Sequence, residues 1–353
     1  MISYVVRRLV IAIPTLFLIC TAAFFLMREA PGTPLTGDRS LPVEIERNIL
    51  AYYHLDKPRL VQFGIWLGVW PVEAADPARW NPESPSYDPD CARLSQFEPV
   101  AELPDKCTHE VFRGLFQGDL GPSFKIKDQT VADLIAQGAP VSITLGITAM
   151  SIALVVGMFL GTMAALRQNT AADYAVMATA TFGITIPNYV VGPVLALVFA
   201  VWLGVLPAGG WVTTQGVEAM ALPVITLALP QIAIMSRLTR SGMIEVLRSN
   251  FVRTARAKGL PERVVLWRHA LKAGILPLVA YLGPGTAALM TGSLVVEQIF
   301  GLPGIGRFFV EGALDRDYSV VMGVVIVYAT LIIGLNLISD ILVALMDPRV
   351  RYE

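Results

Sequence analysis

Basic side chains gather in one stretch of the chain, residues 237–277, which lies between two long apolar runs. Nine of its side chains are basic and two, Glu245 and Glu262, are acidic, although the formal net charge of the whole chain is −1. The bases are Arg237, Arg240, Arg248, Arg253, Arg256, Lys258, Arg263, Arg268 and Lys272. Such a loop can bind the phosphates of anionic lipids, and its charge favours the cytoplasmic side of a membrane.

The centre of this loop has the local pattern of a helix, a stop and a second helix. Residues 250–258 can form about two helical turns. Gly259 can adopt the left-handed conformation that ends them, and Pro261 suits the first position of the next helix. A helical hairpin between two spans suggests a docking site for a partner.

Residues able to catalyse a reaction are not found together in this sequence. It has no GxxxxGK[ST] loop to bind phosphate and no Gly-Lys pair, so we expect no ATP hydrolysis by this chain. His54, His109 and His269 are isolated and lack metal-ligand spacing. We therefore predict no catalytic residue, no metal site and no cofactor bound by the chain itself.

Polar residues within apolar runs are the remaining candidates. Asp340 and Asn336 lie in the last run, where an ionisable group usually faces other helices or a water-filled cavity. We expect Asp340 to pair with Arg237 or Arg240 rather than to contact substrate. Glu297 has two interpretations, contact with a peptide amine or capping of an external helix end. Thr286, Thr291 and Ser293 either line a path or join helices.

The composition places these residues in a membrane protein. Hydrophobic residues make up 54% of the 353 residues and charged ones 16%, and the mean hydropathy is +0.60. The apolar runs are continuous rather than alternating, which favours spanning helices over a closed barrel. The net charge argues against a nucleic-acid-binding role.

Six spans are expected, which makes this an all-α membrane protein. They cover residues 9–27, 141–166, 174–203, 222–238, 276–298 and 320–346. The third is too long to cross straight, and Pro187 in residues 184–188 gives it a place to kink. Arg7 and Arg8 precede the first span, which is long for a signal peptide. The charges of the connections place both termini in the cytoplasm.

A large hydrophilic segment, residues 28–139, separates the first two spans. It carries 17 acidic and 11 basic side chains, a net charge of −6, which favours the external side. Residues 42–53 are expected to form a short helix, residues 71–104 an irregular loop, and residues 131–137 the approach to the second span. The chain then divides into residues 1–138 and a permease core, residues 139–347, with its cytoplasmic loop at about 248–272.

Two of the three cysteines, Cys91 and Cys107, lie in or next to the irregular loop. In an oxidising compartment a disulfide between them would stabilise a segment with little core of its own, and we favour it over two free thiols. Cys20 lies in the first span, where we expect it only to pack.

The basic loop resembles the cytoplasmic signature of binding-protein-dependent ABC importer permeases, a Glu-Ala-Ala triplet followed by a glycine. Here the triplet is Arg253, Thr254 and Ala255, and the glycine is Gly259. Arg253 replaces the acid and Lys272 replaces the loop proline, the nearest proline being Pro277; the Arg-Thr-Ala-Arg-Ala-Lys-Gly form is typical of the oligopeptide and dipeptide branch. The resemblance implies that this loop couples to a separate ATPase, with Ala255 and Ala257 permitting close approach. The coupling residues are Arg253, Thr254, Ala255, Arg256, Ala257, Lys258 and Gly259.

Further motifs extend the resemblance over nearly the whole chain. Residues 30–34, 118–124, 297, 300–306, 336–340 and 347–349 are similar to the first membrane subunit of the oligopeptide branch. Residues 65–112 are longer than that subunit usually has, so the resemblance says nothing about them.

The resemblance implies a type I ABC importer permease fold in the bacterial cytoplasmic (inner) membrane. Its expected partners are a second, homologous permease subunit in a heterodimer, two cytoplasmic ATPase subunits that hold ATP and Mg, and an extracytoplasmic peptide-binding protein. The lipid bilayer surrounds it, and transport would follow an alternating-access cycle.

Other functions remain open at this stage. A secondary transporter or channel would need inverted repeats or buried acids, and a membrane-anchored receptor would leave five spans unexplained. Within the family, the cargo may also be a dipeptide, nickel, glutathione or a cell-wall peptide.

Overall fold

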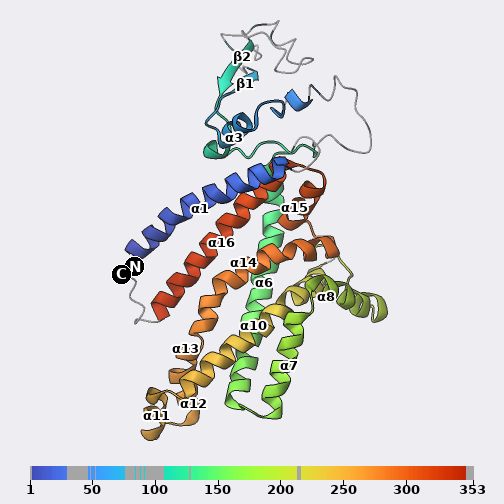
Figure 1. The fold of residues 1–353 in the computed structure, drawn as a ribbon. Coiled ribbons are helices and arrows are strands. Elements are labelled where there is room, and N and C mark those ends of the chain that lie inside the picture. Colours follow the sequence, from blue (N-terminus) through green and yellow to red (C-terminus); the bar gives the residue numbers. More distant parts are fainter. Residues whose placement is uncertain are drawn as a thin grey trace. The chain divides into compact units, whose positions relative to one another are not determined.

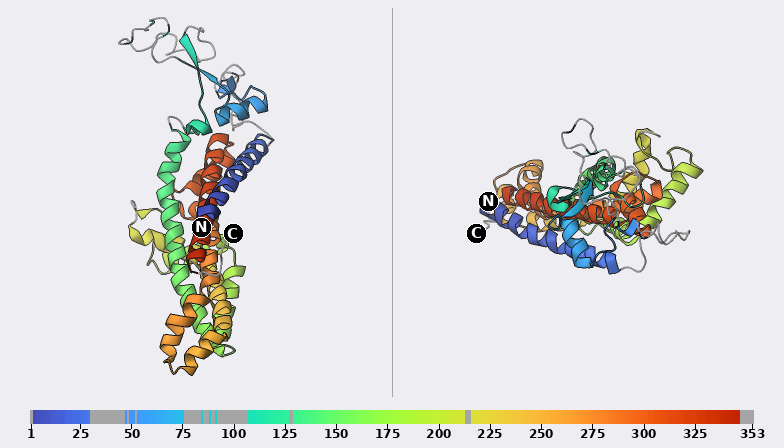
Figure 2. Two further views of the ribbon diagram at one scale, coloured as in Figure 1. Left: turned by 90° about the vertical axis from the view of Figure 1, so that its left-hand side faces the viewer. Right: turned by 90° about the horizontal axis from the view of Figure 1, so that it is seen from above.

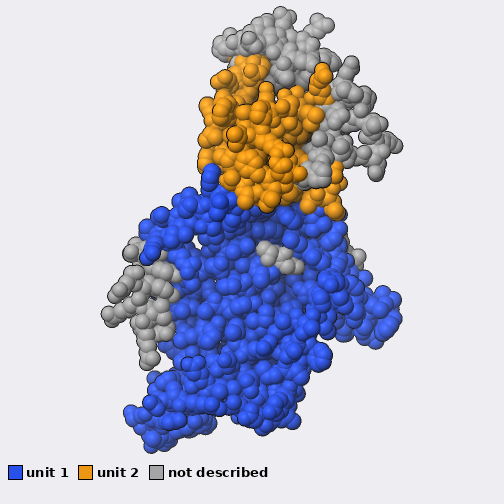
Figure 3. All heavy atoms as spheres, in the orientation of Figure 1, with its two compact units in different colours: residues 1–19, 135–311, 324–353 blue, residues 20–134, 312–323 orange. Residues whose placement is uncertain are grey.

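The structure, a computed structural model, describes residues 2–29, 47, 49–51, 53–75, 84, 88, 91, 107–126, 129–212 and 216–346 (Figure 1). Four expected features lie wholly or mostly outside these residues: the turn 30–34, the helix 42–53, the loop 71–104 and the motif 347–349. The chain divides into two compact units, residues 1–19, 135–311 and 324–353, and residues 20–134 and 312–323 (Figure 3). This division does not follow the expected boundary at residue 138, because residues 1–19 cluster with the permease core.

Long apolar helices dominate the first unit. Four helices of the described residues are long and apolar enough to cross a membrane, and three bent helix pairs bring the number to at most seven. The four are α1 (Ile2–Glu29), α6 (Val131–Leu166), α10 (Ala221–Leu247) and α16 (Tyr318–Met346). The chain is therefore a multi-pass helical membrane protein, and the six expected spans fall within the observed limits.

Helix α6 is longer than the expected second span. The approach 131–137 and the span 141–166 form one helix of 36 residues, which includes Pro140. At 1.5 Å per residue it is about 54 Å long, more than a hydrocarbon core of about 30 Å requires. Helix α6 therefore has room to extend beyond the bilayer.

The expected third span is broken rather than kinked, so the prediction of one continuous helix was wrong. Helix α7 (Ala171–Thr185) ends where expected, but α8 (Asn188–Leu195) and the π-helical η4 (Ala196–Trp202) turn away by 102°. Proline disfavours a helical conformation in the residue before it, and Ile186 is extended, with φ −83° and ψ 120°. Two helices at a right angle can form a broken span or a re-entrant segment.

The fifth expected span, α14 (Leu276–Phe300), also adjoins sharp bends. It meets α15 (Ile305–Leu314) at 87° and the preceding cytoplasmic-loop helix at 46°. Both bends lie at short breaks between helices.

Helix α10 forms the centre of the first unit, where it contacts α7, α8 and α14 (Figures 1 and 2). A close approach joins it to α6. A Cβ atom on Gly157 would lie 2.7 Å from the Cβ of Met235, and one on Gly161 would lie 2.4 Å from the carbonyl oxygen of Ser236. Glycines four residues apart let helix backbones approach closely in membranes. The core around them includes buried Leu145, Ala149, Leu222, Leu227, Met235, Leu278, Leu289 and Val296.

The second unit contains the only sheet of the described residues. Helix α3 (Arg59–Leu67) precedes β1 (Val72–Ala75), which pairs antiparallel with β2 (Thr108–Val111), Val72 lying opposite Val111. The short η3 helix (Leu115–Gln117) follows. Strand β1 corrects the expectation that residues 71–104 are irregular throughout, and its partner lies 36 residues further along the chain. Cys91 and Cys107 form a disulfide next to β2, and Cys20 is free and buried.

Candidate functional site

The basic loop forms the helical hairpin that its sequence predicts. Helix α11 (Asn250–Ala257) is followed by Gly259, whose φ of +76° lies in the left-handed region. A Cβ on Gly259 would meet no atom within 4 Å, so the backbone conformation alone favours glycine. Pro261 is the N-cap of α12 (Glu262–Val264) rather than its first residue, and η6 (Val265–Ala270) and α13 (Leu271–Gly274) continue to α14.

One face of α11 is buried against the chain's own helices. Val252 and Ala255 join a cluster of buried apolar side chains with Ala165 of α6 and Met243 of α10. Val265 and Ala270 of η6 complete it, and we call this group the loop core. Ala255 is 6% exposed, so its small side chain admits α11 to this core rather than admitting a partner. This corrects the role expected for Ala255.

The other face of α11 is free among the described residues. Phe251, an apolar side chain, is 46% exposed. The remaining expected coupling residues are also exposed: Arg253, Thr254, Arg256, Ala257, Lys258 and Gly259. A helix with a buried stripe and an exposed, basic second face can dock in a groove of another protein.

An exposed ion pair closes the hairpin. Arg256 donates to Glu262 through Nε at 3.1 Å and Nη2 at 2.5 Å. Hydrogen bonding to Glu262 raises the pKa of Arg256. Because both side chains are well exposed, such a pair contributes about 0–1 kcal/mol.

A buried ion pair joins α7 to α10 near this loop. Arg240 donates to Asp173 through Nε at 2.5 Å and Nη2 at 2.7 Å, and Asp173 is 1% exposed. The backbone N–H of Asn169 adds a bond of 2.9 Å to the same carboxylate, and Arg248 donates to the side chain of Gln168 at 3.0 Å. These contacts tie the α6–α7 turn to the end of α10 that leads into α11 (Figure 2).

The expected pairing of Asp340 with Arg237 or Arg240 was wrong. Arg240 is committed to Asp173, and Arg8 of α1 lies 2.7 Å from Asp340 of α16. Sequence reasoning missed Asp173 because it stands just before the expected third span. The available signal was its place in the first turn of a helix, where acidic residues are favoured.

Glu297 is fully buried, with 0% exposure. Its carboxylate accepts from the hydroxyls of Ser142 at 2.7 Å and Ser293 at 2.8 Å, and from the backbone N–H groups of Gly306 at 2.8 Å and Arg307 at 3.3 Å. The geometry corresponds to the helix-cap interpretation, because these N–H groups begin α15. In this conformation Glu297 joins α6, α14 and α15.

The polar candidates are not brought into one site. Asn336 lies where α14 and α16 approach closely, since a Cβ on Gly283 would be 2.9 Å from its Cα. Its side-chain oxygen is buried and accepts no hydrogen bond from the described residues. Asp340 and Glu297 have separate partners. The described residues contain no group of three or more His, Cys, Asp or Glu placed to hold a metal ion.

Comparison with known proteins gives consistent matches. The family model described as "Binding-protein-dependent transport system inner membrane component" matches residues 157–352. The oligopeptide transport system permease protein OppB of Salmonella typhimurium is 44% identical over 352 residues, which cover 100% of both chains. The dipeptide transport system permease protein DppB of Bacillus subtilis is 35% identical and covers 99% of this chain and 98% of that protein. A solved chain of an amino acid ABC transporter with histidines aligns with a TM-score of 0.46 and 16% identity, covering 62% of this chain and 95% of that chain.

Proposed function

The chain belongs to the family of binding-protein-dependent transport system inner membrane components, and on this premise we propose that it is the membrane-spanning permease subunit of an ATP-driven oligopeptide importer. The family describes a transport component of the membrane rather than an enzyme. The observation that carries the proposal is the two-faced helix α11, which is anchored inside by Val252 and Ala255 and open outside. Family membership replaces the alternatives of an ion-driven transporter, a channel or a receptor.

The cargo is proposed from the relatives. Oligopeptides are favoured over dipeptides because the oligopeptide permease is 44% identical and the dipeptide permease 35%. Nickel, glutathione and cell-wall peptides have no support from the relatives compared here.

The topology and location follow from the same premise. We place the chain in the bacterial inner membrane with six spans, a type I fold and both termini in the cytoplasm. The segment between α1 and α6 then lies on the external side. Four unbroken and up to seven possible spans are compatible with this arrangement.

The proposed partners are a second permease subunit, two ATPases that bind ATP and Mg, and an external peptide-binding protein. The ATPase would receive the outer face of α11, where Phe251 is the main apolar anchor and Arg253 and Lys258 supply charge. No nucleic acid and no cofactor bound by this chain are part of the proposal.

The contacts around α11 suggest how motion would pass into the membrane. Closure of the ATPase pair would move α11, and the loop core would carry that motion to α10. The Arg240–Asp173 pair would make α7 follow, and the glycine contact would make α6 follow. The break at Ile186 and Pro187 lies at the far end of α7, where the direction of the chain changes. These helices would then move together while the cavity opens alternately to each side.

Co-purification tests this function. The tagged chain is expressed with its partner permease, and the complex is examined for bound ATPase. Gly259→Pro should abolish ATPase binding, because it alters a left-handed turn that only glycine adopts easily. Gly204→Pro is the matched control, since Gly204 also has a positive φ of 63° and open space around it. Equal ATPase binding by both variants would contradict the docking assignment.

A further inference from the structure

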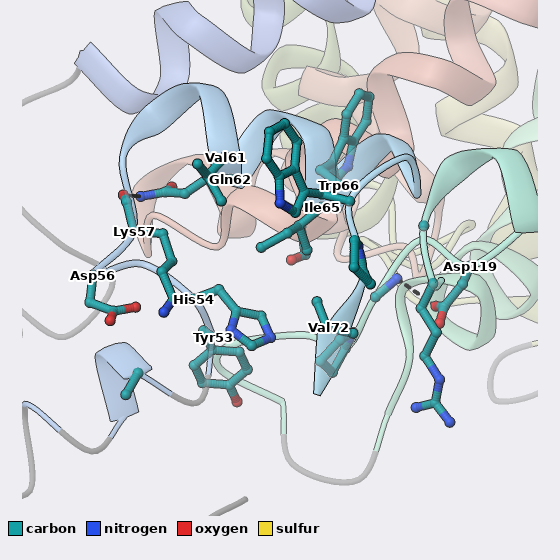
Figure 4. A pocket seen from close by; sticks show the side chains of 18 of the residues that line it. Tyr53, His54, Asp56, Lys57, Val61, Gln62, Ile65, Trp66, Val72 and Asp119 are labelled. Carbon is teal, nitrogen blue, oxygen red and sulfur yellow. Dashed lines mark hydrogen bonds between the residues drawn. The ribbon is translucent and has the colours of Figure 1, made fainter. Parts of the chain in front are cut away.

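A cleft of about 730 Å³ lies within the second unit, inside the range of roughly 300–1,000 Å³ that is usual for ligand sites (Figure 4). Helix α3, the turn before it, β1 and residues 113–124 form its walls. The expected coupling and translocation residues are elsewhere, so this cleft has no part in the function proposed above.

Aromatic side chains line the cleft and are held in place. Tyr53 and Phe124 have ring centroids 4.5 Å apart, and the backbone N–H of Phe124 donates to the buried carboxylate of Asp317 at 2.8 Å. Trp66 stacks on Phe63 at 6.0 Å. These contacts give the walls fixed positions, as a binding site requires.

Trp70 also lines the cleft but is 53% exposed. An exposed indole on a hydrophilic segment offers a large apolar surface that a ligand can cover. Together with the fixed rings, it makes the middle of the cleft suitable for an apolar side chain.

Charged side chains of both signs surround these rings. Figure 4 shows Asp56, Lys57 and His54 at one end of the cleft and Asp119 at the other, with Trp66 between them. Glu73 and Arg113 also line it. Among the described residues, the side chains of Asp56, Lys57, Glu73 and Arg113 make no ion pair or hydrogen bond, so their charges are available to a ligand.

His54 adds a neutral polar group. Its φ is +56°, an uncommon conformation for a residue other than glycine, and one that is often found at functional sites. Burial lowers its pKa, and the Lys57 charge acts in the same direction, although Asp56 and Glu73 oppose it. At neutral pH the imidazole therefore offers one donor and one acceptor.

An apolar middle between separated opposite charges matches the chemistry of a short peptide with free termini. We propose that this cleft is a peptide-binding site on the permease itself, with Lys57 contacting the peptide carboxylate, Asp119 the ammonium group, and Trp66 and Trp70 an apolar side chain. Asp119 keeps one oxygen for this contact while the other accepts from the N–H of Gly121 at 2.9 Å. The inference rests on the proposed function, because it gives the cargo a first contact on this chain.

Photo-crosslinking tests the site directly. The assembled complex of two permeases and two ATPases, without binding protein, is incubated in nanodiscs with a tripeptide that carries a central p-benzoylphenylalanine. Mass spectrometry then locates the crosslinks. We expect them within residues 53–73 and 113–124, and competition by an unlabelled tripeptide with free termini.

Matched variants separate the charges from general folding effects. Lys57→Gln should weaken competition by the free-acid tripeptide about tenfold, the loss of one ion pair of ~1.4 kcal/mol, and should leave competition by its C-terminal amide unchanged. Asp119→Asn should act in the same way on the free amine compared with its acetylated form, and Asn preserves the acceptor for Gly121. Trp70→Ala should lower the crosslink yield about tenfold as well, by loss of aromatic contact. Phe116→Ala is the control, because Phe116 is 64% exposed on the same segment but does not line the cleft.

Three outcomes would overturn the inference: crosslinks only within the spans, equal competition by acids and amides in every variant, or crosslinks from the cleft to the binding protein but never to peptide. ATP-driven uptake by the full system, measured in parallel, separates this inference from the proposed function. Uptake without cleft crosslinks removes the site alone, whereas absence of uptake by the intact system removes the function.

Discussion

The basic loop and the external segment both expose many charges, yet they are stabilised in different ways. Helix α11 has eight residues, and its stability comes from burying Val252 and Ala255 in the loop core, among helices that fold for other reasons. The external segment instead depends on the aromatic contacts of Phe24 with Phe63 and Trp66, and on the disulfide of Cys91 with Cys107. The loop therefore responds to any change in its supporting helices, whereas the segment depends on its own cross-links.

The buried pair beneath the loop should give the largest effect. Asp173→Ala leaves the Arg240 guanidinium unpaired in a buried site, and we expect a loss of about 3–5 kcal/mol in stability. Thermal unfolding of the purified complex measures it. The double variant Asp173→Ala with Arg240→Met should recover most of the loss, because it removes the unpaired charge. A single variant as stable as the wild type would show that the pair does not join α7 to α10.

The disulfide should give the next largest effect, confined to the external segment. Cys91 and Cys107 are 16 positions apart, so removing the bond by Cys→Ser at both positions should destabilise the segment by about 3 kcal/mol. Limited proteolysis should cut residues 107–126 faster, while cleavage at Lys258 and Arg263 stays unchanged. Faster cleavage at both places would contradict separate modes of stabilisation.

Two neighbouring residues of α11 separate support from docking. Val252 is fully buried, so Val252→Ala should cost about 2 kcal/mol of stability through lost apolar burial. Phe251 is exposed, so Phe251→Ala should leave stability unchanged and weaken ATPase binding about tenfold, an affinity loss of ~1.4 kcal/mol. Thermal unfolding and titration with purified ATPase measure the two effects. The reverse result would mean that the two faces of α11 were assigned incorrectly.

The smallest expected effect is the pH response of the external segment. Burial lowers the pKa of His54 in the folded state, so below about pH 6.5, the ordinary histidine value, the unfolded state binds more protons. The segment should therefore lose stability as pH falls from 7.5 to 5.5. Proteolysis of residues 107–126 should accelerate in the wild type and less so in His54→Asn, a residue that tolerates positive φ. Identical pH profiles would exclude His54 as the cause.

The sequence predicted the basic loop well because its signals are local. The stop at Gly259, the helix before it and the break before Pro187 each depend on a few neighbouring residues. The apolar runs predicted most of the helices for the same reason. What the runs did not contain was direction, so the 102° bend between α7 and α8 was not predicted.

The unpredicted features depend on residues far apart in the chain. Asp173 and Arg240 are separated by 67 positions and Ser142 and Glu297 by 155, and nothing near either residue identifies its partner. Strand β1 pairs across a long insertion, and the cleft exists only once α3, β1 and residues 113–124 have come together. Charge counting therefore assigned Arg240 to the wrong acid, because Asp340 was the most conspicuous acid within a span.

Peptide uptake into proteoliposomes tests the central claim most directly. Both permeases, both ATPases and the binding protein are reconstituted, and a radiolabelled oligopeptide is supplied on the side of the binding protein. The account predicts uptake that requires ATP hydrolysis and is lost with Gly259→Pro but retained with Gly204→Pro. Uptake by the permeases alone, driven by an ion gradient and unaffected by Gly259→Pro, would contradict it.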